Sequence, residues 1–112
     1  MKPIYASDPS GLRAVVNAPA VLLYFYHDHC APCRALRPKV ETLLHTQFSE
    51  MQLVYVNGME HRNLSARWQV FGFPTLVGLF EGKEYFRKSK FISLAELSEA
   101  IARPYRLRFS LG

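Results

Sequence analysis

Residues 20–38 read AVLLYFYHDHCAPCRALRP. Every residue from Ala20 to Tyr26 is apolar, which predicts a strand in the interior of a sheet, covered on both faces. The two cysteines of the chain, Cys30 and Cys33, follow that strand. Apolar side chains then recur at helical spacing, which predicts an amphipathic helix over about residues 33–48. The cysteine pair is therefore expected where a buried strand ends and a helix begins.

The remainder of the sequence predicts an α/β domain with a mixed central sheet, in the order β-α-β-α-β-α-β-β-α. The other expected elements are a short strand over residues 3–6, a helix starting at 7–9, a buried strand over 53–56, a short helix near 61–69, a hairpin of 75–80 with 84–91, and a last helix from residue 93. Pro104 is expected to end that last helix. A strand, a helix and a strand within about 35 residues favour a right-handed parallel crossover.

The bulk composition limits the class of protein. A chain of 112 residues is long enough for one domain, and its apolar share of 49% excludes a disordered chain. No apolar run approaches the roughly 20 residues that span a membrane, so no membrane partner is expected. The N-terminal residues contain a lysine but no apolar stretch after it, so we expect no signal peptide and a cytoplasmic protein.

The net charge of +5 is concentrated near the C-terminus. Residues 83–112 carry seven Lys or Arg against three Glu, whereas residues 1–82 carry seven against six acidic residues. Such an excess is typical of a solvated face, or of a surface that docks an acidic partner. It indicates nucleic-acid binding only weakly, and we expect no nucleic-acid partner.

Residues 104–112 form a basic tail in which apolar Tyr105, Leu107, Phe109 and Leu111 alternate with polar residues. This period of two predicts an added strand. Such a strand could pair with the protein's own sheet, with a second copy of the chain or with a partner, and a frayed tail is the alternative. The sequence leaves the oligomeric state open. A non-enzymatic adaptor that uses this tail for docking is a competing function.

The spacing of Cys30 and Cys33 favours redox chemistry over a structural role. A disulfide that closes so short a loop constrains the unfolded chain little. The N–H groups and positive dipole end of a helix N-terminus stabilise an anion, and so they lower the pKa of a thiol placed there. We therefore expect Cys30 to be the more exposed residue and the attacking thiolate. Cys33, one helical turn later, is expected to resolve the mixed disulfide.

Two segments resemble the signature motifs of the thioredoxin family. Residues 24–38, with their CAPC motif and a proline inside the following helix, are similar to the family's active-site strand, motif and helix. Residues 72–76, GFPTL, are similar to its second signature. The order and spacing of the expected elements match the family over residues 3–103. Residues 1–103 are therefore expected to form a thioredoxin-like domain.

This resemblance implies a thioredoxin fold with a central sheet of about five strands flanked by helices. It implies a thiol–disulfide oxidoreductase that reduces or exchanges disulfides in protein partners and is recharged by an upstream reductase. The redox-active pair stands in place of a cofactor, and no metal is implied. The resemblance also implies a cis peptide bond at Phe73–Pro74 that faces the cysteines, with the Phe73 backbone pairing to an extended substrate. Phe91 is expected beside the same substrate groove.

The sequence departs from the family at positions next to the cysteines and the groove. His29 stands where tryptophan is usual, and Ala31 where glycine is usual. The family's buried aspartate and its lysine neighbour correspond to Tyr24 and Tyr55, and a groove glycine corresponds to Lys90. Without the aspartate, another group or water must take the proton from the second cysteine.

Three polar residues before the first cysteine, His27, Asp28 and His29, are the candidates for that proton transfer, because histidine titrates near neutral pH. A protonated His29 would also stabilise the attacking thiolate. The alternative is that all three are solvent-exposed loop residues. Lys90 and Phe91 are expected to narrow the groove and so to restrict the set of partners.

Zinc binding is a second competing function, because His27, His29, Cys30 and Cys33 form a zinc-type ligand set. All four lie within seven residues, however, without the long loop that lets a structural site wrap a metal. A glutaredoxin-like role is less favoured, since no glutathione-binding pattern is evident. We therefore expect thiol–disulfide exchange in preference to a metal site.

Overall fold

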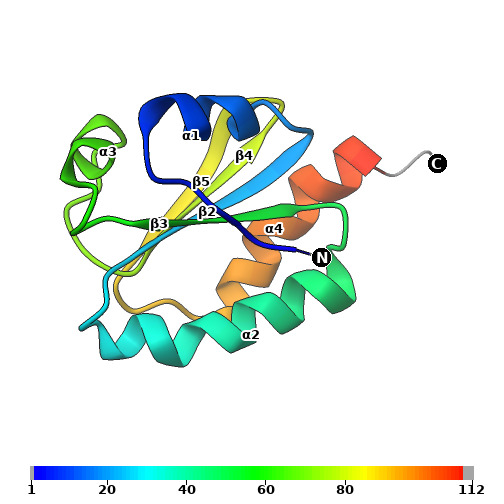
Figure 1. The fold of residues 1–112 in the computed structure, drawn as a ribbon. Helices are drawn as coiled ribbons and strands as arrows, with labels where there is room; N and C mark the ends of the chain where they lie inside the picture. Colours follow the sequence, from blue (N-terminus) through cyan, green and yellow to red (C-terminus); the bar gives the residue numbers. More distant parts are fainter. Residues whose placement is uncertain (1, 110–112) are drawn as a thin grey trace.

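The computed structural model describes residues 2–109 and places strand β2 (Ala20–Tyr26) at the centre of a five-stranded sheet. The strand order is β1-β3-β2-β4-β5 (Figure 1). The other strands are β1 (Ile4–Tyr5), β3 (Gln52–Asn57), β4 (Thr75–Phe80) and β5 (Lys83–Ser89). Strands β1, β3 and β2 run parallel, whereas β4 is antiparallel to β2 and β5 is antiparallel to β4. The predicted mixed sheet is confirmed.

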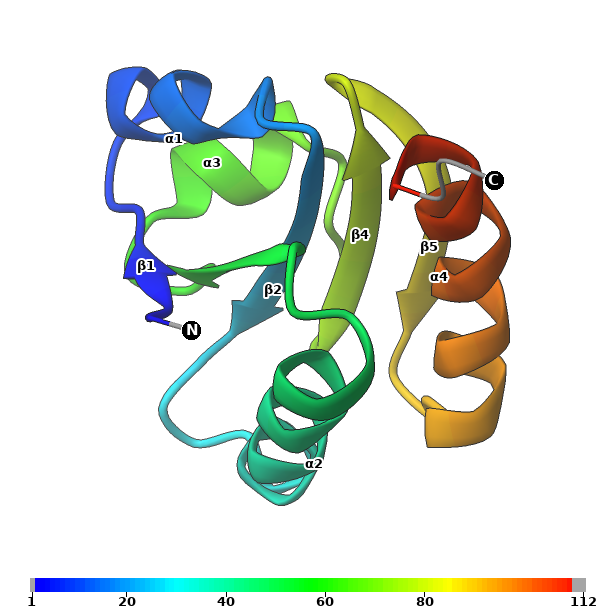
Figure 2. The ribbon, with the colours of Figure 1, turned by 90° about the vertical axis from the view of Figure 1, so that its right-hand side faces the viewer.

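Two pairs of helices cover the two faces of this sheet (Figures 1 and 2). Helices α2 (Ala31–Gln47) and α4 (Leu94–Phe109) contribute to one core cluster, and α1 (Pro9–Val16) and α3 (Arg62–Arg67) contribute to the other. Within residues 2–109, none of these helices combines the length and the apolar character that a bilayer crossing needs.

The position of β2 explains why its residues are all apolar. Its side chains alternate between the two core clusters. Leu22 and Tyr24 pack on the side of α2 and α4, whereas Val21, Leu23 and Phe25 pack on the side of α1 and α3. All five side chains are 0% exposed. Full burial of one such side chain contributes about 1.5–3 kcal/mol to the free energy of folding relative to exposure. Strand β2 is therefore held rigidly in the core, and it fixes the position of the residues that follow it.

Strand β5 ends at Ser89, before the predicted end at Phe91. Lys90 adopts a left-handed backbone conformation with φ 67°, which does not continue a strand. Its N–H donates a hydrogen bond to the carbonyl oxygen of Pro74 at 2.7 Å, so the chain turns there toward the segment that precedes β4. Phe91 consequently lies in a loop and is 96% exposed.

The prediction for the C-terminal tail is wrong over residues 104–109. Helix α4 continues through Pro104 to Phe109, so the helix does not end at the proline and no added strand forms there. The physical reason is that Leu97, Ile101, Tyr105 and Phe109 are spaced by four residues and pack on the α2 side of the sheet. Residues 110–112 lie outside the described residues. The adaptor function was suggested by an alternating, strand-like tail. Because residues 104–109 are helical, they no longer support it.

Tyr105 anchors this last part of α4. Its ring packs against Phe48 with centroids 5.1 Å apart and against Phe109 at 4.6 Å. Its hydroxyl accepts a hydrogen bond from the backbone N–H of Glu50 at 3.0 Å. An ion pair between Arg108 and Glu81 joins the same helix to the β4–β5 turn. These contacts offset the cost of about 3 kcal/mol that a proline carries inside a helix.

We predict that Tyr105→Ala lowers the free energy of unfolding by about 2 kcal/mol, because it removes a half-buried aromatic side chain from the core. Urea denaturation followed by circular dichroism measures this change. Leu107→Ala, two residues later on the same helix, is the matched control because Leu107 is 74% exposed, and it should change stability little. Equal effects of the two substitutions would show that the end of α4 does not pack as described.

Candidate active site

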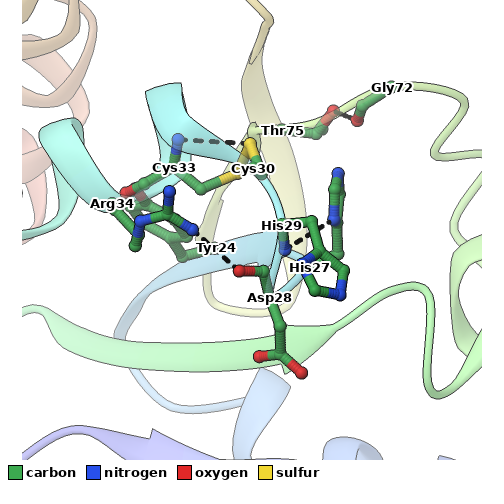
Figure 3. Close-up of a disulfide and its surroundings, with 9 residues drawn as sticks. All are labelled: Tyr24, His27, Asp28, His29, Cys30, Cys33, Arg34, Gly72 and Thr75. Atoms are coloured by element: carbon green, nitrogen blue, oxygen red, sulfur yellow. Dashed lines mark hydrogen bonds between the residues drawn. A yellow bond between two sulfur atoms is a disulfide. The ribbon is translucent and has the colours of Figure 1, made fainter.

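Cys30 and Cys33 form a disulfide at the start of α2, with their Cα atoms 5.2 Å apart (Figure 3). Cys30 is the N-cap residue of the helix, and its Sγ accepts a hydrogen bond from the backbone N–H of Cys33 at 3.2 Å. Pro32 occupies the first turn, where a missing N–H costs nothing. The sulfur of Cys30 thus lies where unpaired N–H groups and the helix dipole favour a negative charge.

Both cysteines are buried in this oxidised state. Cys30 is 5% exposed and Cys33 is 3% exposed. The exposed fraction of Cys30, which was expected to be the larger, is larger by only a small margin. Their different positions distinguish them more clearly. Cys30 caps the helix, whereas Cys33 lies within its first turn, and both belong to the core cluster under α2.

Tyr24 lies directly beneath the pair. Its hydroxyl donates a hydrogen bond to the backbone carbonyl oxygen of Cys33 at 2.6 Å. Burial, together with the charge of Glu41, raises the pKa of Tyr24 well above its ordinary value of 10.0. The phenol therefore stays protonated at neutral pH and cannot take a proton from the Cys33 thiol.

A network of aromatic and charged side chains surrounds Tyr24 on the β3 side. Tyr55, opposite Tyr24 in the sheet, packs edge-on against it at 5.2 Å and hydrogen-bonds to Glu41. The Arg37 guanidinium lies 4.1 Å from the centre of the Tyr55 ring, forms an ion pair with Glu41 at 3.7 Å and hydrogen-bonds to the Tyr5 hydroxyl. Burial and the Glu41 hydrogen bond raise the pKa of Tyr55. Every charge in this network has a partner.

A cavity of about 140 Å³ reaches Cys33 from the same side. It is lined by Tyr24, Tyr26, His27, Asp28, Cys33, Arg34 and Arg37. The cavity offers water a path to the second cysteine, and its charged lining residues are Asp28, Arg34 and Arg37. The sequence predictions did not single out either arginine.

The three polar residues before Cys30 are placed differently from one another. His27 accepts a hydrogen bond from the His29 backbone N–H at 3.2 Å and packs edge-on against Phe73 at 5.2 Å. The carboxylate of Asp28 points away from the sulfur atoms and lies 3.4 Å from the side-chain amide of Asn57 (Figure 3). His29 is exposed and does not line the cavity beside Cys33. The structure therefore brings His27 and Asp28 to that cavity and leaves His29 outside it.

The segment before β4 forms the other side of the site. The Phe73–Pro74 peptide bond is cis, the isomer that the family resemblance implies. The Phe73 ring packs between the two core clusters, while within residues 2–109 its backbone N–H and carbonyl make no hydrogen bond to another backbone group. Pro74 is buried and lines a groove together with Pro32 from the active-site helix. Phe91 lines the same groove.

Metal binding receives no support from this arrangement. Among the residues that the structure describes, no group of three or more His, Cys, Asp or Glu side chains is placed to hold an ion. Cys30 and Cys33 are bonded to each other, and the His27 ring is turned toward Phe73. The zinc-type ligand set of the sequence is thus not assembled in space.

A family model for thioredoxin matches residues 8–103, and the chain belongs to the thioredoxin family. The chain is 28% identical over 85 residues to the thioredoxin-like protein YdfQ of Bacillus subtilis (strain 168), a match that covers 76% of this chain and 75% of that protein.

Two solved structures agree with this assignment. A mutant thioredoxin from Halobacterium salinarum NRC-1 superposes with a TM-score of 0.83 at 27% identity, covering 99% of this chain and 94% of that one. Thioredoxin from Fasciola hepatica superposes with a TM-score of 0.81 at 27% identity, covering 89% of this chain and 97% of that one. The predicted thioredoxin fold is confirmed.

We predict that Tyr24→Phe lowers the free energy of unfolding of the oxidised protein by about 1–3 kcal/mol. The substitution leaves the buried carbonyl of Cys33 without the phenol donor. Tyr85→Phe is the matched control, because it removes the same oxygen from a tyrosine that is 57% exposed. Urea unfolding of both variants measures the difference. If Tyr24→Phe is as stable as Tyr85→Phe, the hydroxyl does not support Cys33 as described.

Proposed function

We propose that this protein is a thiol–disulfide oxidoreductase that reduces or exchanges disulfides in protein partners through Cys30 and Cys33. The observation that carries the proposal is the position of the Cys30 sulfur, which caps α2 and accepts the Cys33 N–H. A thiolate in that position would be stabilised before it attacks. Membership of the thioredoxin family supports the same reaction.

The reaction begins with the reduced protein. The Cys30 thiolate attacks one sulfur of the partner's disulfide, and the other partner sulfur leaves as a thiolate that takes up a proton. The Cys33 thiol then loses its proton, and its sulfur attacks Cys30 in the mixed disulfide and releases the second partner sulfur. The partner gains two electrons and two protons, while Cys30 and Cys33 become the disulfide. An upstream reductase would return two electrons and two protons.

The proton of Cys33 leaves by a route that does not use Tyr24, since burial keeps that phenol protonated. The cavity beside Cys33 gives water access, and His27 and Asp28 line it. We propose that water in this cavity takes the proton, with Arg34 and Arg37 stabilising the thiolate that remains. His29 lies outside the cavity, and its proposed contribution is limited to stabilising the Cys30 thiolate.

Substrate recognition would use the segment around the cis bond. We propose that the free backbone groups of Phe73 pair with an extended segment of the partner, as a strand adds to a sheet edge. Pro74 and the exposed Phe91 would contact the residues on either side of the partner's disulfide. We propose a cytoplasmic location, where the reducing conditions would suit this direction of reaction.

A trapping experiment tests the assignment of the two cysteines. Cys33→Ser should form a stable mixed disulfide with a disulfide-bridged peptide, because the attacking Cys30 remains and the resolving thiol is absent. Mass spectrometry of the adduct under non-reducing conditions locates the bond, which is expected on Cys30. Cys30→Ser is the control and should form adducts at least tenfold more slowly. Adducts formed equally fast by Cys30→Ser would overturn the assignment of the nucleophile.

A further inference from the structure

The groove beside the disulfide has a volume of about 470 Å³ and has both apolar and charged walls. Its lining residues are Pro32, Ala35, Leu36, Lys39, Pro74, Lys90, Phe91, Ile92 and Ser93. Most of them are apolar, and the two charged ones are both lysines. Neither wall contributes an aspartate or a glutamate. A partner segment in this groove therefore meets apolar surface and positive charge.

The two lysines approach the groove from separate elements. Lys39 is carried by α2, and Lys90 by the loop that follows β5. Both are exposed, and neither takes part in any of the ion pairs found among residues 2–109. The acidic residues nearest in sequence are placed elsewhere. Glu41 pairs with Arg37, Glu84 pairs with Arg87, and Glu96 is exposed in the first turn of α4, outside the groove lining.

The position of Lys90 is fixed by its surroundings. Its N–H is bonded to the carbonyl of Pro74, and its side chain lies against Gly72, where a β-carbon would come within 2.7 Å of Lys90 Cε. The left-handed backbone of Lys90 is unfavourable for a residue with a side chain. Such a conformation is often retained at a functional site. The lysine thus lies beside the segment whose backbone would receive the substrate.

Two large apolar residues are the sequence neighbours of Gly72 and Lys90. Phe71 precedes Gly72 and is 89% exposed, and Phe91 follows Lys90 and is 96% exposed. Phe91 lines the groove, whereas Phe71 is not among its lining residues. Phe91 therefore adds an apolar component to the charge of the lysines.

We propose that this groove selects disulfides whose flanking residues are acidic and apolar, with partner carboxylates paired to Lys39 and Lys90 and an apolar residue against Phe91. This inference rests on the proposed oxidoreductase function and specifies its substrate class. Opposite charges across such an interface raise the rate of association and fix the register of the partner. A pair of exposed charges is worth up to about 1 kcal/mol, which corresponds to about a fivefold change in kcat/KM.

The test compares three disulfide-bridged peptides of equal length that share one apolar residue and carry Glu, Gln or Lys on both sides of the disulfide. The reduced protein is expected to reduce the Glu peptide about fivefold faster than the Gln peptide in kcat/KM, and the Lys peptide more slowly still. High salt should narrow these differences, because the lysines are exposed.

Variants assign the preference to the groove. Lys90→Gly suits the left-handed backbone and should reduce the preference for the Glu peptide, and Lys39→Glu should reduce it further or reverse it. Lys83→Glu is the matched control, because Lys83 is an exposed lysine at the far end of β5, outside the groove, and it should keep the preference.

The outcomes separate the two proposals. If the protein reduces all three peptides equally well, the inference about acidic substrates is wrong and the oxidoreductase function stands. If Lys90→Gly and Lys39→Glu keep the full preference, the groove is not its source and the inference also fails. If no peptide is reduced while a chemical reductant opens all three, the proposed function fails, and this inference fails with it.

Discussion

The N–H of Cys33 pointing at the sulfur of Cys30 is the interaction on which the rest of the site depends. It requires that α2 begin at Cys30 and that its axis be held in a fixed direction. Val40 and Leu44 bury one face of α2 against the sheet, and β2 ends only a few residues before the helix starts. Because β2 is packed on both faces, neither the strand nor the helix can shift without exposing core side chains.

The surroundings of the second cysteine differ from the pattern that its family resemblance implies. A tyrosine whose pKa is raised by burial holds the carbonyl of Cys33, and a second tyrosine, an arginine and a glutamate complete the network behind it. These groups satisfy one another's hydrogen bonds and charges, and the Tyr24 phenol that holds the Cys33 carbonyl stays protonated at neutral pH. In the proposed mechanism, proton transfer therefore uses the small cavity at the end of β2.

The sequence predicted the parts of this structure that depend on local pattern. The apolar run from Ala20 to Tyr26 indicated a central strand, because a strand that is buried on both faces needs apolar residues at every position. The helical spacing of apolar residues after Cys33 indicated α2, because one face of that helix is buried. The tail was ambiguous, since Tyr105 and Phe109 satisfy a strand period of two and a helix spacing of four. The packing of Tyr105 against Phe48, which is distant in the sequence, favours the helix over the strand.

The predictions from sequence missed what depends on long-range contact. Arg37 and Tyr5 are 32 positions apart, and no local pattern indicates that they meet beside the active site. The left-handed conformation of Lys90 likewise accompanies a hydrogen bond from its N–H to the carbonyl oxygen of Pro74, which is distant in the sequence. His29, chosen from sequence for its closeness to Cys30, lies outside the cavity, because adjacency in the chain does not determine the direction of a side chain.

The pH dependence of alkylation of the reduced protein tests most directly whether the start of α2 activates Cys30. Iodoacetamide reacts with thiolates, so the rate at each cysteine, followed by mass spectrometry, reports its ionisation. We predict that Cys30 reacts first and reaches half its maximal rate clearly below pH 8.5, the approximate pKa of a free thiol. Faster reaction at Cys33, or a Cys30 midpoint at or above that value, would contradict the account.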